Sequence, residues 1–505
     1  MEGIIRERKS RKQQVTDPFP TRRESTGRAS AVVAGTRWMT VGEMATQILR
    51  MVTYVWLARL LEPRHFGVLA MALVITNFVD VIKDLGTRSA VIQKKDVSQG
   101  FASSIFVVNV IVAAFVIGVI VAIAPLVGNL FGTPDVIPVL RVMSLAIGIA
   151  ALGLVQQGLL YRAMRFRALA LAQITGAVIQ GIVALSMGAL GFGVWALVAG
   201  IIASALSTTS IIWTASRWRP HLHIRWNDIR EVASFSLNLS GARVLTFLVN
   251  DADKFIIGRA LGAAALGLYS LGWRIVSQIL TATGNVLQQI LFPALSAIQD
   301  DNARIRRDFL RMMSAVALVF FPLTIGLAVV AGPFVRAVLG VDWVPAIPLI
   351  TILALIAPIQ VLIWGAGILF QVKGRTDWML RWRIVSGLTI VGAYILGLRW
   401  GLIGVTASFA FAVVVLSYPA MAIPFRLIDL NLPRFLQEMV PYAVASGVMA
   451  VLVAIAQRLV DSLGGGDMAM FISSVAVGVA VYGSFVWWYR PESWHDALVL
   501  LGARN

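Results

Sequence analysis

Long apolar stretches alternate with short polar segments along almost the whole chain. A helix needs about 20 predominantly apolar residues to cross the hydrocarbon core of a bilayer. Stretches of that kind lie at residues 38–60, 66–88, 102–128, 136–160, 168–190, 193–215, 235–258, 264–290, 312–334, 345–370, 380–398, 401–424, 439–458 and 469–489. The pattern predicts an all-α integral membrane protein with about 14 transmembrane helices.

The connections between these stretches alternate in charge, as the cytoplasmic and outer loops of membrane proteins do. One alternate set is basic and reads QKKDVSQ, YRAMRFR, SRWRPHLHIRWNDIR, DDNARIRRDFLR, VKGRTDW and FRLIDLNLPR. The other set carries few basic residues and reads LLEPRH, FGTPD, LGFG, RALGAAA, GVDW, GLRWG and RLVDSLGGGD. The alternation predicts that both termini are cytoplasmic. The outer loops are short, so they offer no sizeable domain for an active site.

Composition agrees with a membrane protein and narrows the chemistry. Of 505 residues, 58% are hydrophobic and only 13% are charged, against about 25% charged in soluble domains. The absence of cysteine excludes disulfides and thiolate metal sites. The four histidines show no ligand spacing, so we expect no metal site. The net charge of +18 is explained by the cytoplasmic loops and tail, and we expect the lipid bilayer rather than nucleic acid as a partner.

The first part of the chain is repeated in the second at an offset of 200 residues. VWLARLLEPRHFGVLAMALVI at 55–75 aligns with FIIGRALGAAALGLYSLGWRI at 255–275, matching Arg59 with Arg259 and Gly67 with Gly267. Parallel repeats are typical of transporters whose two halves rock around a central path. We predict two pseudo-symmetric six-helix lobes (helices 1–6 and 7–12) around a central cavity, plus helices 13–14. The predicted parts are a basic disordered cytoplasmic tail (1–34), the first lobe (35–217), a basic linker (218–234), the second lobe (235–426), helices 13–14 (427–490) and a C-terminal tail (491–505).

Polar side chains inside the apolar stretches concentrate on the first two helices of each lobe. An embedded charge is costly and usually faces protein or water, and at 100° per residue these side chains fall on one face of each helix. The stretch VNDADKFIIG at 249–258 is the most polar of them. The candidate substrate-binding residues are Arg37, Arg50, Arg243, Asn250, Lys254, Arg274, Gln278 and Asn285. The candidate ion-coupling residues are Glu43, Asp80, Asp251 and Asp253.

The slight basic excess among these groups favours an anionic substrate that carries phosphate or pyrophosphate. Arginine suits phosphate through its bidentate fork and weak hydration. Embedded carboxylates are candidates for coupling to Na⁺ or H⁺, because burial and neighbouring cations change their affinity for protons. The competing interpretation is that Asp251 or Asp253 forms a structural ion pair with Lys254 or Arg243. The pattern leaves both interpretations open.

Three stretches resemble the polysaccharide transporter (Wzx-type) flippase family of the multidrug/oligosaccharidyl-lipid/polysaccharide exporter superfamily. They are NDADKFIIGRALGAAALGLYSLGWRI at 250–275, VLGVDWVPAIPLITILAL at 338–355 and GILFQVKGRTD at 367–377. The resemblance covers roughly residues 35–490 and leaves the basic tail outside it. Asp253 and Lys254 match the family's Asp and Lys in helix 7. Gln371, Gly374 and Arg375 match its pattern after helix 10, whereas Asp251 has no counterpart in the pattern.

The resemblance implies a function as well as a fold. A protein of this family would move an undecaprenyl-pyrophosphate-linked oligosaccharide from the cytoplasmic to the periplasmic leaflet of the bacterial cytoplasmic membrane, by alternating access. It would be a transporter without catalytic residues, and its protein partners would be a polysaccharide polymerase and chain-length machinery. The alternatives are a lipid II flippase, a multidrug exporter of the same superfamily, and, as an enzyme, a membrane glycosyltransferase or polymerase. The arginines count against the drug exporter, and the short outer loops count against the enzyme.

Overall fold

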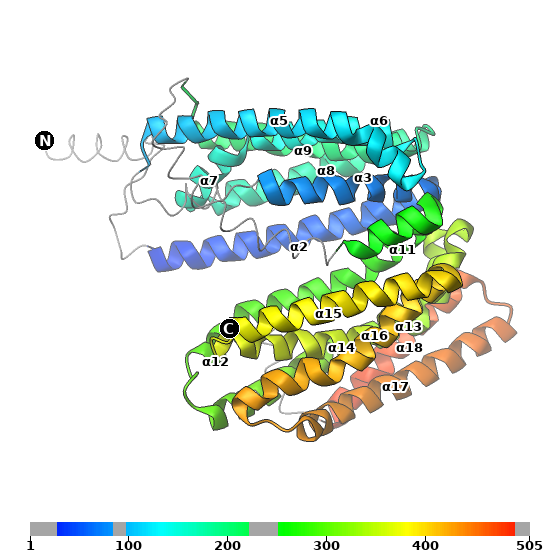
Figure 1. Ribbon diagram of the computed structural model, residues 1–505. Coiled ribbons are helices and arrows are strands. Elements are labelled where there is room, and N and C mark those ends of the chain that lie inside the picture. Colours follow the sequence, from blue (N-terminus) through cyan, green and yellow to red (C-terminus); the bar gives the residue numbers. More distant parts are fainter. Residues whose placement is uncertain (1–27, 84–96, 222–250, 490–505) are drawn as a thin grey trace, which may run out of the picture. The chain divides into compact units, whose positions relative to one another are not determined.

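The computed structural model describes residues 28–83, 97–221 and 251–489, and the regular structure in these ranges is entirely helical (Figure 1). Ten helical stretches among them are long and apolar enough to cross a membrane. One of these stretches, 376–428, contains two of the predicted spans. The prediction of an all-α integral membrane protein is confirmed.

Helices lie at thirteen of the predicted spans within the described ranges. The seventh predicted span, 235–258, falls largely outside those ranges, so the count of 14 stays a prediction. Most of the predicted linker at 218–234, residues 1–27 of the predicted N-terminal tail and the C-terminal tail also lie outside the described residues. Residues 28–34, predicted as part of the disordered tail, belong to α2. The proposed domain boundaries stay predictions.

The chain forms two compact units that divide between Phe255 and Ile256. In the first unit, α2 packs along α8, α8 along α9, and α5 along α6. Small residues allow α2 and α8 to approach closely, because Gly42 lies against Ala170 and Gly181 against Thr53. The helices of this unit are α2 (Arg28–Leu60), α3 (Pro63–Lys83), α5 (Gln99–Phe131), α6 (Val136–Ala151), α7 (Leu154–Arg162), α8 (Phe166–Ala189) and α9 (Val194–Ser216).

In the second unit, α13 packs against α14, α17 and α18, while α16 packs against α14 and α15. A π-helical turn, Leu287–Leu291, follows α11, and a 3-10 turn, Val341–Ala346, precedes α14. The helices are α11 (Ala252–Val286), which begins in the first unit, α12 (Phe292–Ser296), α13 (Asn302–Phe334), α14 (Ile347–Val372), α15 (Thr376–Gly397), α16 (Gly401–Phe425), α17 (Leu432–Ser462) and α18 (Asp467–Tyr489).

Local geometry recurs between the two halves at several positions. Helices α5 and α13 each contain 33 residues, and an acceptor side chain caps each of them. Ser98 Oγ accepts from the backbone N–H of Phe101 at 3.1 Å, and Asp301 Oδ1 accepts from that of Arg304 at 2.9 Å. Serine and aspartate are preferred caps because their oxygens satisfy amides that lack a helical partner. The two halves therefore start their third helices in the same way.

The ends of α7 and α14 provide a second match. Met164 and Gly374 both adopt the left-handed conformation, with φ of 54° and 66°. The next residues, Arg165 and Arg375, donate their backbone N–H groups to Leu160 O and Phe370 O at 2.9 and 2.7 Å. This is the hydrogen-bond pattern of a Schellman ending, in which glycine is favoured. Only the second half has glycine at this position.

The boundary between the first two helices also recurs. In the first unit α2 ends at Leu60 and α3 begins at Pro63. In the second half α11 is broken at Gly262, where φ is 81° and ψ is −177°. Glu62 corresponds to Gly262 at the offset of 200 found in the sequence. Because a side chain is disfavoured at that φ, glycine allows this break within one continuous α11.

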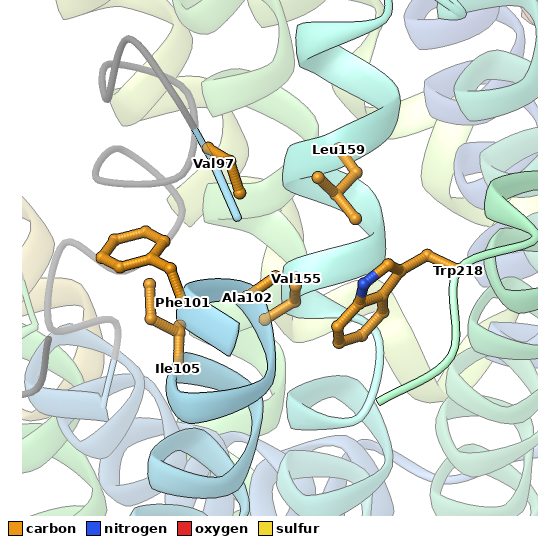
Figure 2. Packing of buried hydrophobic residues seen from close by; sticks show 7 residues of the cluster. All are labelled: Val97, Phe101, Ala102, Ile105, Val155, Leu159 and Trp218. Atoms are coloured by element: carbon orange, nitrogen blue, oxygen red, sulfur yellow. The ribbon is translucent and has the colours of Figure 1, made fainter. Parts of the chain in front are cut away.

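A buried cluster connects α5 and α7 to the segment that follows α9 (Figure 2). The indole of Trp218, which is 1% exposed, lies beside Val155 of α7. Its Nε1–H donates to Gln99 Oε1 at 2.6 Å, and the amide of Gln99 donates to Arg219 O at 2.8 Å. The segment after α9 is thus fixed to the first turn of α5. The other members of the cluster are Val97, Phe101, Ala102, Ile105 and Leu159.

Candidate functional site

Several candidate residues lie where the structure gives no side-chain description. Arg243 and Asn250 fall outside the described residues. Arg37 lies on α2 and Asp80 on α3, but their side chains are also outside the description. Their roles stay predictions.

The polar stretch at 251–254 marks the start of a described helix rather than a helix interior. The chain bends at Asp251 and α11 begins at Ala252. The backbone carbonyl of Asp251 accepts from the N–H of Phe255 at 3.2 Å, and Asp253 Oδ1 accepts from the N–H of Lys254 at 2.8 Å. Carboxylates stabilise a helix start because they accept from free amides and oppose the positive end of the dipole. The two acidic residues therefore have a local structural role that the predicted continuous span did not include.

Lys254 has no such local explanation. A cation in the first turn lies at the positive end of the helix dipole, where it is unfavourable by about 0.3–1 kcal/mol. Its ammonium forms an ion pair with the carboxylate of Asp251, one turn earlier. The side chains of Lys254 and Asp251 are 24% and 13% exposed. A partly buried cation is thus held against the dipole by one neighbouring carboxylate.

Helix α2 has three distinct faces in the first unit. Gly42, Thr46 and Thr53 are buried on the face towards α8. A second face is apolar and exposed, as lipid-facing residues are. Between these two faces lie the predicted polar positions Glu43 and Arg50. The members of the apolar face are Val41, Met44, Ile48 and Val52.

The polar face of α2 is only partly satisfied. Gln47 Nε2 donates to Glu43 Oε1 at 2.9 Å. The Nε of Arg50 is buried and makes no hydrogen bond within the part of the chain that the structure describes. An arginine nitrogen removed from water without an acceptor is costly. The guanidinium of Arg50 therefore retains the capacity to bind an anion.

The part of α11 after Gly262 carries its polar residues opposite its packed face. Tyr269 and Val276 are fully buried in the second unit. Arg274, Gln278 and Asn285 project from the other side of the helix at 100° per residue. Arg274 and Gln278 are half-buried, whereas Asn285 is exposed. The predicted polar line therefore lies across the helix from Tyr269 and Val276.

Two of the three positions matched to the family pattern after helix 10, Gly374 and Arg375, have structural roles. Gly374 occupies the left-handed position that ends α14. The guanidinium of Arg375 stacks over the ring of Trp378 at 4.1 Å and pairs with Asp377 at 3.2 Å. Such contacts stabilise the start of α15. We therefore assign these residues to the fold and not to substrate binding.

Sequence reasoning singled out the charged residues but missed two buried amides. Asn109 on α5 and Gln156 on α7 are 4% and 0% exposed, and their side chains make no hydrogen bond among the described residues. The sequence signal for both residues is an amide side chain within an apolar stretch. It is a weak indication of a binding site, because most buried amides form hydrogen bonds within the protein.

The fold and these features define a multi-pass helical membrane protein of a known transporter architecture. The structure is similar to that of the lipid II flippase MurJ in its inward closed conformation, with a TM-score of 0.70 and 14% identity. The similarity covers 90% of this chain and 98% of that one. At this level of identity the similarity identifies the fold.

The chain belongs to a family of polysaccharide biosynthesis proteins, whose family model matches residues 56–348. It is 24% identical over 398 residues to the lipopolysaccharide biosynthesis protein WzxC of Escherichia coli K12, covering 78% of this chain and 81% of that protein. It is 27% identical over 328 residues to the succinoglycan biosynthesis transport protein ExoT of Rhizobium meliloti, covering 65% and 66%. The family resemblance read from residues 250–275 and 338–355 is confirmed.

Proposed function

We propose that the protein is a flippase that moves a polyprenyl-pyrophosphate-linked oligosaccharide from the cytoplasmic to the periplasmic leaflet of the bacterial cytoplasmic membrane, exposing its binding site alternately to the two faces. The carrying observation is the ammonium of Lys254, partly buried and placed against the helix dipole in a polysaccharide biosynthesis protein. A cation in that position costs stability, so a function at this site is its simplest explanation.

The chemistry of the charged groups supports a phosphate-bearing substrate. The N-terminal turn of α11 presents backbone amides and an ammonium, both of which bind phosphate oxygens. Arg50 on α2 supplies a further cationic donor, because its Nε is buried without a hydrogen-bond partner among the described residues. In this proposal Arg50 and Lys254 of the first unit contact phosphate. Arg274, Gln278 and Asn285 of the second unit stay predicted substrate-binding residues.

The comparisons favour transport over synthesis. MurJ is named a flippase, ExoT a transport protein and WzxC a biosynthesis protein. We include in the proposal that the protein acts beside a polysaccharide polymerase and chain-length machinery. We also include coupling to Na⁺ or H⁺ through Glu43, Asp80 or Asp253, of which Asp253 is 4% exposed. Lipid II is the second candidate substrate, because the MurJ fold covers almost the whole chain.

A reconstituted assay tests the proposal. The purified full-length protein is placed in liposomes with a fluorescent polyprenyl-pyrophosphate-linked oligosaccharide, and transfer between leaflets is followed by quenching from outside. We expect Lys254→Met to slow transfer at least about tenfold, the equivalent of about 1.4 kcal/mol in the barrier. The matched control is Arg307→Met on α13, whose side chain is 74% exposed and which should transfer at the wild-type rate.

Two results oppose the proposal in different ways. Absence of transfer by the wild-type protein, with or without an Na⁺ or H⁺ gradient, would contradict the flippase function. Normal transfer by folded Lys254→Met would remove Lys254 from the binding site. Preference for lipid II over the oligosaccharide lipid would select the second candidate.

A further inference from the structure

Asp251 is the residue that the family pattern does not explain, and the structure gives it two contacts. Its carbonyl accepts the first hydrogen bond of α11, and its carboxylate pairs with the ammonium of Lys254. The backbone contact requires no particular side chain. The ion pair is therefore the reason to have an acidic residue here rather than another helix cap.

The pair is not saturated, unlike a structural ion pair. An ammonium has three donors, and Lys254 uses one of them, on Asp251, within the described residues. A buried ion pair stabilises a fold only when further hydrogen bonds satisfy its remaining donors and acceptors. The two side chains also retain access to solvent, at 24% and 13% exposed. A second anion can therefore reach the ammonium.

Lys373 shows the contrasting arrangement within the same chain. Its ammonium donates to Gln299 O and to Asn302 Oδ1, both at 2.6 Å, and both acceptors are neutral. Lys373 therefore joins the end of α14 to the start of α13 through two neutral acceptors, as a structural lysine does. Among the described residues, Lys254 instead has one charged partner, Asp251, directly before its own helix.

The local sequence leaves Asp251 as the available counter-ion of Lys254. Asp253 Oδ1 is engaged by the backbone N–H of Lys254. Phe255, Ile256, Ile257 and Gly258 carry no charge, and the next charged residue before the break at Gly262 is the cation Arg259. When a phosphate approaches, the ammonium can turn towards it while Asp251 remains at the helix start.

The geometry points to Asp251 as a positioning residue. Its carboxylate holds the ammonium of Lys254 between transport cycles, and the ammonium changes partner from this carboxylate to the phosphate when the substrate binds. This inference rests on the proposed function. The phosphate binds more strongly because it offers the ammonium more acceptor oxygens than the carboxylate does. On release, the carboxylate takes the ammonium back and lowers the affinity for the departing lipid.

The exchange predicts a split between binding and turnover. In Asp251→Asn the competing anion is absent, so a polyprenyl pyrophosphate should bind about threefold to tenfold more tightly and dissociate more slowly. The transfer assay should show a lower KM together with a lower kcat. Asp251→Glu keeps the anion and should stay close to wild type. A merely structural carboxylate would not tighten binding when removed.

Reversal of the Asp251–Lys254 pair distinguishes an exchange of partners by the ammonium from a purely structural ion pair. In the double variant Asp251→Lys, Lys254→Asp the two charges still attract each other, but the ammonium has moved to the helix start. We expect the double variant to bind polyprenyl pyrophosphate at least about tenfold more weakly than the wild type. Reversal of the exposed Arg304–Asp308 pair on α13 is the matched control and should change neither binding nor transfer.

The experiment uses full-length protein in nanodiscs, with radiolabelled polyprenyl pyrophosphate as the probe and thermal unfolding as a check of folding. Wild-type affinity and transfer in the reversed pair would overturn the exchange while leaving the proposed function intact. Weaker binding in folded Asp251→Asn would overturn it as well. A wild-type protein that binds no polyprenyl pyrophosphate would overturn both proposals. If the reversed pair does not fold, Asp251→Asn and Asp251→Glu decide the question.

Discussion

The close approach of α2 and α8 at Gly42 allows a quantitative prediction. A Cβ at Gly42 would lie 2.7 Å from the Cβ of Ala170 and 3.2 Å from its Cα. Carbon atoms in contact are about 3.5–4.0 Å apart, so Gly42→Ala must separate the two helices by about 1 Å. Such overpacking costs about 1–3 kcal/mol, against a helix-propensity gain of about 0.5–1 kcal/mol for removing a glycine. We expect a net loss of about 1–2 kcal/mol.

Gly118 on α5 is the matched control, because nothing lies within 4 Å of a Cβ at that position. Gly118→Ala should leave stability unchanged or raise it by up to about 1 kcal/mol. Unfolding of the full-length protein in mixed SDS–detergent micelles, followed by tryptophan fluorescence, measures both variants. Ala170→Gly should partly rescue Gly42→Ala, with a coupling energy of about 1 kcal/mol. Equal stabilities of Gly42→Ala and Gly118→Ala, or the absence of coupling to position 170, would refute the close-packing argument.

Two further stability predictions follow from single positions. Met164→Gly should stabilise the protein by about 1 kcal/mol, and Gly374→Met should destabilise it by about as much, because both positions have left-handed backbones. The same micelle assay checks this pair, and shifts of the same sign in the two variants would contradict the conformational argument. Trp218→Ala should cost about 3–5 kcal/mol because the side chain is 1% exposed and packs into a cluster. Trp488→Ala, at a position that is 79% exposed, is its control and should have no comparable effect.

Hydropathy could predict most of the helices because it follows directly from the thickness of the bilayer. The orientation that the loop charges predict stays a prediction. The apolar stretches correspond to helices wherever the structure describes them. The break at Gly262 lies in RALGAAA, the loop that the hydropathy pattern predicted between the spans 235–258 and 264–290. The π-helical turn Leu287–Leu291 after α11 was not predictable, since hydrogen-bond register leaves no hydropathy signal.

The candidate site was predicted less well, because charge alone does not show what a side chain contacts. The run NDADK was interpreted as a helix interior, although Asn and Asp residues before an apolar run are typical of a helix start. That signal could have located the bend at Asp251 and the capping role of Asp253. The ion pair of Asp251 with Lys254 was one of two open interpretations, and the structure shows the contact.

The roles of Gly374 and Arg375 depend on details that sequence spacing cannot give. Both matched the family pattern, yet one residue ends α14 and the other stacks on Trp378. Conversely, the buried Nε of Arg50 marks it as a residue with spare binding capacity, which only side-chain packing reveals. A match to the family pattern therefore does not distinguish a residue that stabilises the fold from one that binds substrate.

The most direct test of the central claim is the leaflet distribution of polyprenyl-linked oligosaccharide in cells with and without this protein. A flippase predicts that, in its absence, the complete lipid-linked oligosaccharide accumulates on the cytoplasmic face of the membrane. Wild-type protein should restore the normal distribution, and Lys254→Met at the same protein level should not. Unchanged sidedness with a shortened or missing glycan would contradict the account and place the protein among the synthetic enzymes.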